Sequence, residues 1–468
     1  MFKGSHQQHL KSSFSPPVEH TTSATMSSDG ESTVAVKLFI AKDKKMVLFA
    51  ESDQDFVDVL FSFLTLPLGT IVRRLDKQSQ VGCLDELYKS VENLGEDHFQ
   101  TKACKTMLLS PRNAAAAHLD RLKVEVDDID QTRFYACKRH MGYFSSVPDV
   151  GCPFCGTMDI TIREYSEKDT LDEIFAKSRT KFIITDDLQV APSSTALMFS
   201  LMDKLGLQEQ AKIEEVVLQL NSSKMFSLLA RALLSKQPLT GLYFDVTITP
   251  DAATNVFQLP QNLLAEQKDE TEPTFKSIKM RLIQSKDDTS VLYAEVGHDF
   301  VDIFFCLLCI PLGSIINAYG EWSPNGSLYN LYKSVNEEGC VKQECRSLLL
   351  SPKLPPFFGC SSNVLQVEEE LPRSVASYRH QVNPKEPVRG GGTRRAYIKE
   401  GSTTFMVTDD LHISNFSLAN SLKAIRAAKI PKEKLVEKEL TLDKTQVLKL
   451  LKAAMLTRGA LSSVLLPK

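Results

Sequence analysis

The sequence predicts an α+β protein that contains a tandem duplication of one unit, a β-hairpin followed by helices. Three short strings support this prediction, because each occurs twice at the same separation of 244 residues. The strings are Asp55-Phe-Val-Asp58, Pro67-Leu-Gly69 and Tyr88-Lys-Ser-Val91, which recur as Asp299-Phe-Val-Asp302, Pro311-Leu-Gly313 and Tyr332-Lys-Ser-Val335. A constant separation over three motifs indicates an internal repeat of one globular unit.

The duplication and the composition divide the chain into four regions. Residues 1–33 are rich in Ser, Thr, His and Pro and are expected to form a disordered N-terminal tail. Residues 34–248 form the predicted first repeat, which includes a Cys-rich loop at 135–160. A polar segment with little periodicity, 249–274, is interpreted as a linker. Residues 275–468 form the second repeat, which lacks the Cys-rich loop.

Each repeat is expected to begin with a hairpin and a buried helix. In the first repeat, apolar runs at 36–41 and 46–51 flank a polar turn, which is the pattern of a β-hairpin. A helix should then begin near Asp55, because apolar residues follow at helical spacing, and it should end before Pro67. Asp55 and Asp58, with their counterparts Asp299 and Asp302, are predicted to cap this helix or to oppose the positive end of its dipole. A paired-carboxylate acid and base or a metal site is the alternative.

The remaining elements follow in the same order in both repeats. A second helix is predicted at 84–94 and at 328–338. Each repeat should close with a strand, a helix and another strand. These are expected at 216–220, 223–234 and 239–246 in the first repeat, and at 436–442, 444–456 and 461–466 in the second. Ser222 and Asp443 are the predicted N-caps of the closing helices, and Gly459 is a predicted C-terminal stop.

Bulk composition excludes several classes of protein. Of the 468 residues, 43% are hydrophobic and 24% are charged, as in ordinary globular proteins. The formal net charge of −3 makes nucleic acid an unlikely partner. Apolar runs stay below the roughly 18 residues of a membrane span, so none is expected. The ten cysteines are unevenly spread and do not form the dense pattern of a disulfide framework, which favours reduced thiols or a metal site. We therefore expect an intracellular protein, cytoplasmic or nuclear.

One group of residues has the spacing of a metal site. Cys137-Lys-Arg-His140 is followed after eleven residues by Cys152-Pro-Phe-Cys155. Two short turns with two ligands each can enclose a zinc ion in a tetrahedral shell, so Cys137, His140, Cys152 and Cys155 are the predicted ligands of a zinc-ribbon-like loop. Reduced structural thiols and a redox-active Cys-x-x-Cys are the alternatives.

The second repeat lacks an equivalent of this cluster. Its corresponding region contains Tyr378-Arg-His380 and then Gly390-Gly-Gly392, without a cysteine pair. A metal in one copy only is expected to stabilise an irregular loop rather than to perform chemistry common to both repeats. Four protein ligands would also leave no coordination position for a substrate.

Acidic pairs supply the alternative functional hypothesis. Asp186-Asp187 and Asp409-Asp410 each follow an apolar strand and precede a turn. Adjacent residues on a strand point to opposite faces, so turn formation and capping is the favoured interpretation. The alternative is a small-ligand-binding protein or enzyme that uses both turns. The Pro-Leu-Gly strings lack the lysine of a phosphate-binding loop and are interpreted as turns.

At this level of detail the chain resembles a known family. The strings KLFIAKDKKMVLFAE, DFVDVLFSFLTLPLGTIVRRL, LYKSVENL, MLLSPRN, FYAC with CPFC, and FIITDDL occur in this order. They are similar to the plant domain-of-unknown-function family numbered 674. The resemblance implies a plant source, a duplicated unit and a cysteine cluster near the middle of the first copy, and it implies no catalytic activity. His140 stands where other members would have a further cysteine.

The sequence therefore favours a scaffold or protein-interaction module over an enzyme. The repeated strings are apolar faces, caps and turns, so no catalytic residue is predicted. The only cofactor expected is structural zinc, and the expected partners are proteins of unknown identity.

Overall fold

The computed structural model describes most of the chain. The described residues are 32–163, 174–178, 180–206, 212–247, 275–287, 290–321, 323, 326–372, 374–375, 378–386 and 394–466. The predicted tail lies outside them except for residues 32–33. The predicted linker and Gly390–Gly392 lie wholly outside them.

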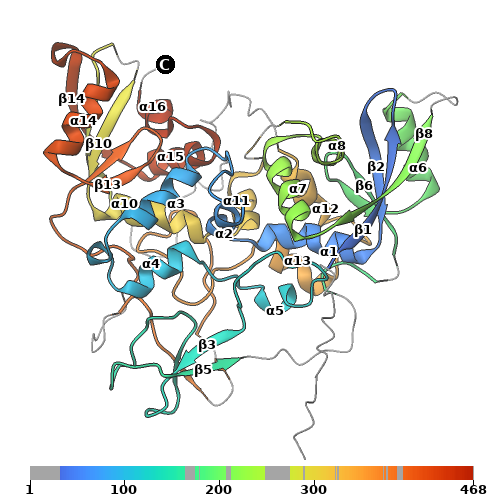
Figure 1. Ribbon diagram of the computed structural model, residues 1–468. Coiled ribbons are helices and arrows are strands. Elements are labelled where there is room, and N and C mark those ends of the chain that lie inside the picture. Colours follow the sequence, from blue (N-terminus) through green and yellow to red (C-terminus); the bar gives the residue numbers. More distant parts are fainter. Residues whose placement is uncertain are drawn as a thin grey trace, which may run out of the picture. The chain divides into compact units, whose positions relative to one another are not determined.

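Two antiparallel five-stranded sheets have the same strand order (Figure 1). The first has the order β7-β6-β2-β1-β8, with β1 (Val34–Ala41), β2 (Met46–Ser52), β6 (Phe182–Thr185), β7 (Val190–Pro192) and β8 (Ile213–Leu220). The second has the order β13-β12-β10-β9-β14, with β9 (Ile278–Ser285), β10 (Val291–Val296), β12 (Phe405–Thr408), β13 (Ile413–Asn415) and β14 (Leu435–Leu442). The predicted hairpins are β1–β2 and β9–β10, and both are confirmed.

Each sheet has an inner and an outer apolar face. Alternate residues of β1, such as Val36 and Leu38, point into the main core, as expected for a strand with period-two hydrophobicity. The outer face is covered by one helix in each sheet. Leu197 and Leu201 of α6 (Thr195–Lys204) pack on the first sheet, and Ile425 of α14 (Leu418–Ala428) packs on the second.

The predicted buried helix is present in both repeats. It is α1 (Gln54–Ser62) with the 3₁₀ turn η1 (Phe63–Thr65), and α10 (His298–Cys306) with η3 (Leu307–Cys309). Seven consecutive residues of α1 are buried, Phe56 through Ser62, so this helix is surrounded by the core rather than lying on its surface. Each of these segments ends before a proline, Pro67 or Pro311, which is the N-cap of the next helix, α2 (Leu68–Arg74) or α11 (Leu312–Tyr319).

The repeated Pro-Leu-Gly strings meet each other at a contact between the repeats. The backbone N–H of Leu68 donates to the carbonyl of Ile310 (3.0 Å), and that of Leu312 donates to the carbonyl of Leu66 (2.9 Å). A β-carbon on Gly69 would lie 2.9 Å from the Leu308 carbonyl oxygen, so the close approach requires glycine. The predicted turns are thus one place where the two copies touch.

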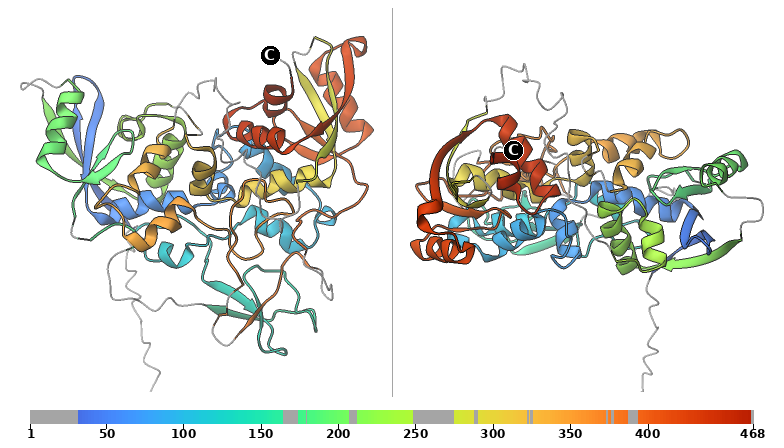
Figure 2. Two further views of the ribbon diagram at one scale, coloured as in Figure 1. Left: turned by 180° about the vertical axis from the view of Figure 1, so that it is seen from behind. Right: turned by 90° about the horizontal axis from the view of Figure 1, so that it is seen from above.

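The next helix of each repeat lies against the sheet of the other repeat (Figures 1 and 2). Ser90 of α3 (Leu84–Asn93) accepts a hydrogen bond from the Ile413 N–H of β13 through its Oγ (2.7 Å). Its counterpart Ser334 of α12 (Leu328–Ser334) accepts one from the Val190 N–H of β7 (2.9 Å). Residues Ser32–Lys468 accordingly form one compact unit.

The predicted strands at 239–246 and 461–466 are wrong, because the structure has helices there. The elements observed there are α8 (Pro238–Tyr243) and α16 (Ala460–Leu465). A short apolar run does not distinguish a strand from a buried helix, and Pro at the first helical position of α8 favours the helix. Gly459 is the N-cap of α16 rather than the stop of the preceding helix.

The closing strand and long helix of each repeat are confirmed. The helices are α7 (Ser222–Leu234) and α15 (Lys444–Leu456). Asp443 caps α15 in a capping box with Gln446, as predicted, whereas α7 is capped by Asn221 rather than by Ser222. The other helical elements are η2 (Glu96–His98), α4 (Lys102–Leu109), α5 (Ala116–Leu119), α13 (Gln343–Leu350) and η4 (Lys432–Lys434).

A third, smaller sheet carries the Cys-rich loop. Its order is β11-β4-β3-β5, with β3 (Arg133–Ala136), β4 (Tyr143–Ser145), β5 (Ile160–Arg163) and β11 (His380–Gln381). Strand β11 belongs to the second repeat and pairs in parallel with β4. The small sheet has its own apolar cluster, separate from the main core.

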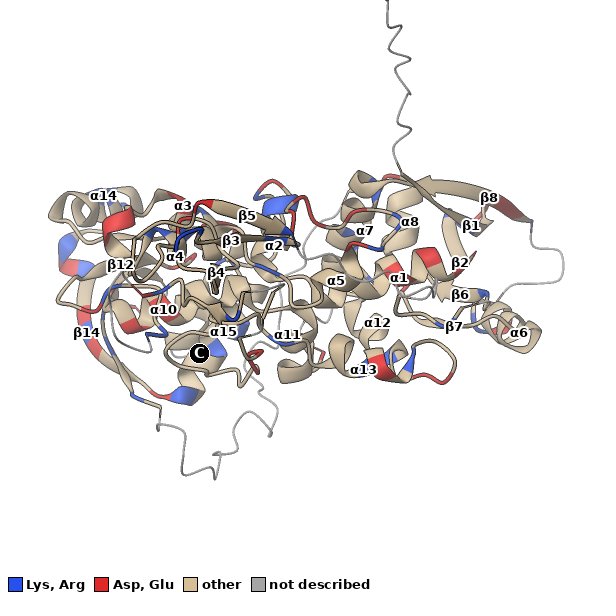
Figure 3. Cartoon of the chain, turned by 90° about the horizontal axis from the view of Figure 1, so that it is seen from below, with Lys and Arg blue, Asp and Glu red and all other residues tan. Residues whose placement is uncertain are grey.

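Charges are interspersed over the described elements (Figure 3), in line with the small net charge of −3. Within the part of the chain that the structure describes, no helix is long and apolar enough to cross a membrane.

Candidate metal centre

The four predicted ligands converge in the structure. One donor atom from each of Cys137, His140, Cys152 and Cys155 lies within 4.8 Å of the others. The Cys137 Sγ lies 3.4 Å from the Cys155 Sγ and 3.6 Å from the His140 Nδ1. The Cys152 Sγ lies 3.5 Å from the same imidazole nitrogen. The sequence spacing therefore identified a real spatial cluster, which could bind a metal such as zinc.

These separations fit a tetrahedral zinc ion. With zinc–sulfur bonds of about 2.3 Å and zinc–nitrogen bonds of about 2.0–2.1 Å, a tetrahedron places two sulfurs about 3.8 Å apart and a sulfur and a nitrogen about 3.6 Å apart. The two observed sulfur–nitrogen separations, 3.6 and 3.5 Å, match this geometry, and the sulfur pair at 3.4 Å is slightly shorter.

The local sequence explains how each turn presents its ligands. Residues 137–142 form the tip of the β3–β4 hairpin, where the His140 backbone N–H donates to the Cys137 Sγ (3.3 Å). In the second turn the Gly156 N–H donates to the Cys152 carbonyl (2.8 Å), and Gly156 has a φ of 80°, a conformation that favours glycine. Backbone N–H groups that point at a thiolate stabilise its negative charge, as a metal ligand requires.

Burial differs among the ligands. The side chains of Cys137 and Cys152 are fully buried, whereas Cys155 and His140 are half-buried. A hydrogen bond with the Thr157 hydroxyl (3.4 Å) is the main cause that lowers the pKa of the Cys155 thiol to about 6. Burial instead raises the pKa of Cys137. The half-buried Cys155 thiol therefore ionises more readily than the buried Cys137 thiol.

Aromatic rings surround the cluster on its exposed side. The Phe154 ring packs against the His140 imidazole, with centroids 5.1 Å apart, and against the edge of the Tyr143 ring at 5.2 Å. Tyr143 in turn stacks on His380 of the second repeat at 5.1 Å. Sequence reasoning compared His380 with the first-repeat site but did not predict that the two would touch, because nothing local marks a contact between residues so far apart.

The first residue of each acidic pair is used in hydrogen bonds within its own repeat. The Asp186 carboxylate accepts from the backbone N–H (2.9 Å) and the hydroxyl (2.6 Å) of Thr240, in α8. The same hydroxyl accepts the Val47 N–H of β2 (2.8 Å). Asp409 accepts equivalent bonds from Ser462, in α16. These carboxylates hold the last helix of each repeat to the sheet, in agreement with the predicted capping role.

The second residue of each pair also has an intramolecular partner. Asp187 accepts from the Thr185 hydroxyl (2.5 Å) and from the Asn330 amide (3.0 Å), and Asp410 accepts from the Thr408 hydroxyl. Asp187 therefore also joins the first repeat to α12 of the second, whereas the Thr185 and Thr408 contacts are those of turns.

Asp58 and Asp302 have a role that sequence reasoning missed. They lie inside α1 and α10 rather than at a cap, so the capping prediction is wrong for both. Asp58 accepts the backbone N–H groups of Phe175 (2.8 Å) and Ala176 (2.6 Å), and Asp302 accepts that of Tyr397 (2.6 Å). Burial is the main cause that raises the pKa of Asp58 to about 6. A carboxylate in an otherwise apolar helix was the available signal.

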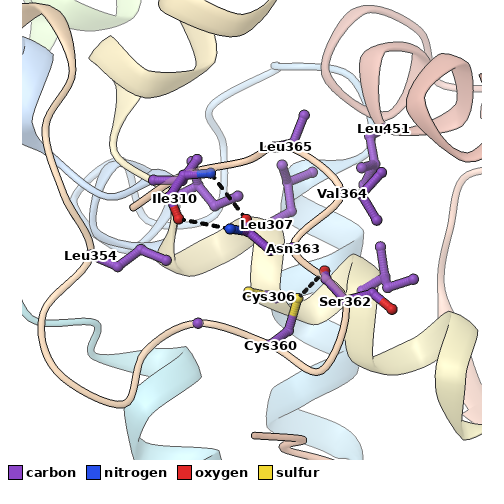
Figure 4. A pocket seen from close by; sticks show the side chains of 13 residues that line it. Cys306, Leu307, Ile310, Leu354, Cys360, Ser362, Asn363, Val364, Leu365 and Leu451 are labelled. Carbon is purple, nitrogen blue, oxygen red and sulfur yellow. Dashed lines mark hydrogen bonds between the residues drawn. The ribbon is translucent and has the colours of Figure 1, made fainter. Parts of the chain in front are cut away.

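A pocket in the second repeat lies beside η3 and α15 (Figure 4). Leu307, Ile310, Val364 and Leu451 supply much of its apolar lining. The side-chain amide of Asn363 donates to the Val367 carbonyl, and its oxygen accepts the Val367 N–H, so both ends of this amide have a partner in the chain. The paired aspartates of the alternative hypothesis do not line this pocket.

Comparison with known proteins agrees with the resemblance seen in the sequence. The model of one family, described as protein of unknown function (DUF674), matches residues 30–390 and 378–468. No curated protein and no solved structure matches the chain. The match covers most of the sequence, including both repeats and the Cys/His cluster, and the chain therefore belongs to the DUF674 family.

Proposed function

We propose that this protein is a non-enzymatic scaffold or protein-interaction module, built from two copies of one unit and stabilised by one structural zinc ion. The observation that carries the proposal is the convergence of four donor atoms, from Cys137, His140, Cys152 and Cys155, within 4.8 Å of one another. Four protein ligands complete the usual zinc shell, so the ion would hold two turns together and leave no position for a substrate.

The other repeated polar groups support a structural role. The carboxylates of Asp58, Asp186, Asp302 and Asp409 bind backbone N–H groups of the chain itself. None of the ten cysteines forms a disulfide, a state that an intracellular location would maintain. The expected partners are proteins, which affinity purification from native tissue followed by mass spectrometry would identify.

The test of the zinc centre is a metal measurement on full-length protein purified under reducing conditions without chelator. We expect one zinc per chain by inductively coupled plasma mass spectrometry. Cys155→Ala should reduce zinc to background, and Cys340→Ala, which removes a thiol outside the cluster, should leave it unchanged. Wild-type protein without zinc would contradict the proposal.

The alternative, a ligand-binding protein or enzyme that uses Asp186/Asp187 and Asp409/Asp410, gains no support from these contacts. It predicts that Asp187→Asn changes the binding of metabolites recovered with the protein from native tissue.

A further inference from the structure

We propose that the metal centre extends into the second repeat, so that zinc binding and the docking of a second-repeat segment stabilise each other. This segment, named here the docking segment, consists of Val375 and residues 378–382. The inference rests on the proposed zinc site and adds to it a coupling between the two copies of the duplicated unit.

The backbone of the docking segment binds the turn that carries a ligand. The N–H groups of Arg379 (3.0 Å) and His380 (2.7 Å) both donate to the carbonyl of Gly142, two residues after the ligand His140. The Val382 N–H donates to the Phe144 carbonyl (2.8 Å). These bonds form the parallel pairing of β11 with β4. Gly142 has a φ of 111°, so the carbonyl that accepts both bonds depends on a turn conformation favoured by glycine.

Side chains form a second connection between the ligand and the docking segment. The rings of His140, Phe154, Tyr143 and His380 follow one another with centroids 5.1, 5.2 and 5.1 Å apart. A rotation of the His140 imidazole out of the metal shell would therefore disturb Phe154, and through it the stack of Tyr143 on His380.

The apolar cluster beneath the small sheet also requires both repeats. Phe134, Ala136 and Phe144 of the first repeat are buried together with Val375 of the second, and Tyr378 packs against them. A cluster of this size buries little apolar surface, so it needs an additional constraint such as a metal to remain ordered. The metal ligands Cys137 and His140 lie at the tip of the β3–β4 hairpin, and the docking segment bonds to the same tip and to β4.

Reciprocal stabilisation follows from this arrangement. Zinc would fix the tip of the hairpin at residues 137–142, which prepares the Gly142 and Phe144 carbonyls for the docking segment. A docked segment would in turn hold the hairpin in the conformation that binds zinc. By linkage, each event must favour the other by the same free energy.

The first experiment measures zinc affinity in full-length protein by competition with a chromogenic chelator. Val375→Ala and His380→Ala should each weaken zinc binding by about 10-fold, the usual effect of removing a group that supports a metal ligand. Neither residue donates to the metal. Leu371→Ala is the matched control, because Leu371 precedes the docking segment and is 86% exposed. Wild-type zinc affinity in both variants would overturn the coupling.

The second experiment measures the reverse effect by hydrogen exchange with and without zinc. Zinc removal should speed exchange at the N–H groups of Arg379, His380 and Val382. Exchange at Ile413 and Val190, whose N–H groups bind serines between the repeats, should not change. Equal protection of the docking segment in both states would overturn the inference. Absence of zinc from the wild type contradicts the proposed function itself, whereas one bound zinc without coupling contradicts the inference alone.

Discussion

At the scale of single residues, the buried carboxylates act as acceptors for backbone N–H groups. Asp58 lies inside an apolar helix and accepts two such groups from residues 175–176. Asp186 reaches Thr240 in the same way, and burial is the main cause that raises the pKa of both carboxyls to about 6. These groups satisfy buried donors but carry a cost when they ionise.

The raised pKa of Asp58 predicts a stability that depends on pH. A carboxyl whose pKa increases from 3.8 to about 6 on folding lowers the stability by about 3 kcal/mol once the pH exceeds both values. The stability associated with the protonated Asp58 carboxyl is fully present below about pH 4 and is lost as the pH rises through about 6.

Asp58→Asn removes this titration and keeps an oxygen acceptor for both N–H groups. We therefore expect the variant to gain stability relative to the wild type between pH 4 and 7, by up to about 3 kcal/mol in urea unfolding. Asp55→Asn, at a half-buried position at the start of the same helix, is the control. A difference between Asp58→Asn and wild type that stays constant with pH would contradict the assignment.

At the scale of elements, the repeated Pro-Leu-Gly strings bring the backbones of the two copies into close contact. Each glycine begins a helix and faces a backbone carbonyl of the other repeat. A β-carbon on Gly313 would lie 2.9 Å from the Leu64 carbonyl and 2.6 Å from the Leu349 carbonyl. Backbone atoms cannot move aside as a flexible side chain can, so both glycines are required by packing.

Gly69→Ala and Gly313→Ala should each destabilise the protein by about 1–3 kcal/mol, the usual cost of overpacking a core. Gly297→Ala is the matched control, because it also lies at a helix start but has no heavy atom within 4 Å of the added carbon. Thermal unfolding measures the three variants side by side. If Gly69→Ala lowered the unfolding temperature no more than Gly297→Ala does, the repeats would not pack this closely.

At the scale of the molecule, each repeat packs one helix against the sheet of the other repeat. Helix α3 lies on the sheet of the second repeat, and α12 lies on the sheet of the first. The docking segment adds a third contact, because it completes the small sheet that carries the metal cluster. Association of the repeats therefore depends on a shared core rather than on the covalent connection between them.

This arrangement predicts that cutting the connection leaves the protein assembled. A protease site inserted between residues 250 and 274 of the full-length chain should be cleavable without dissociation. The two fragments should co-elute in gel filtration and should separate in denaturant. Two fragments that elute separately in native buffer would contradict this mutual packing.

The sequence by itself determined the α+β class, the two opening hairpins, the buried helices and the four candidate ligands. These features have local causes: period-two and helical hydrophobicity, turn residues, and ligands held in pairs by short turns. They could be predicted because each depends on residues close together in the chain.

The tertiary structure decided the rest. Residues 238–243 and 460–465 are helices rather than strands, and Asp186 and Asp409 hold these helices through Thr240 and Ser462. Three sets of contacts join residues that are more than 100 positions apart. They are the bonds of Asp58 to its backbone partners, the packing of α3 and α12 on the sheet of the other repeat, and the contact of His380 with the metal loop. Such contacts leave no periodic or spacing signal in one sequence, because they depend on how the two copies pack.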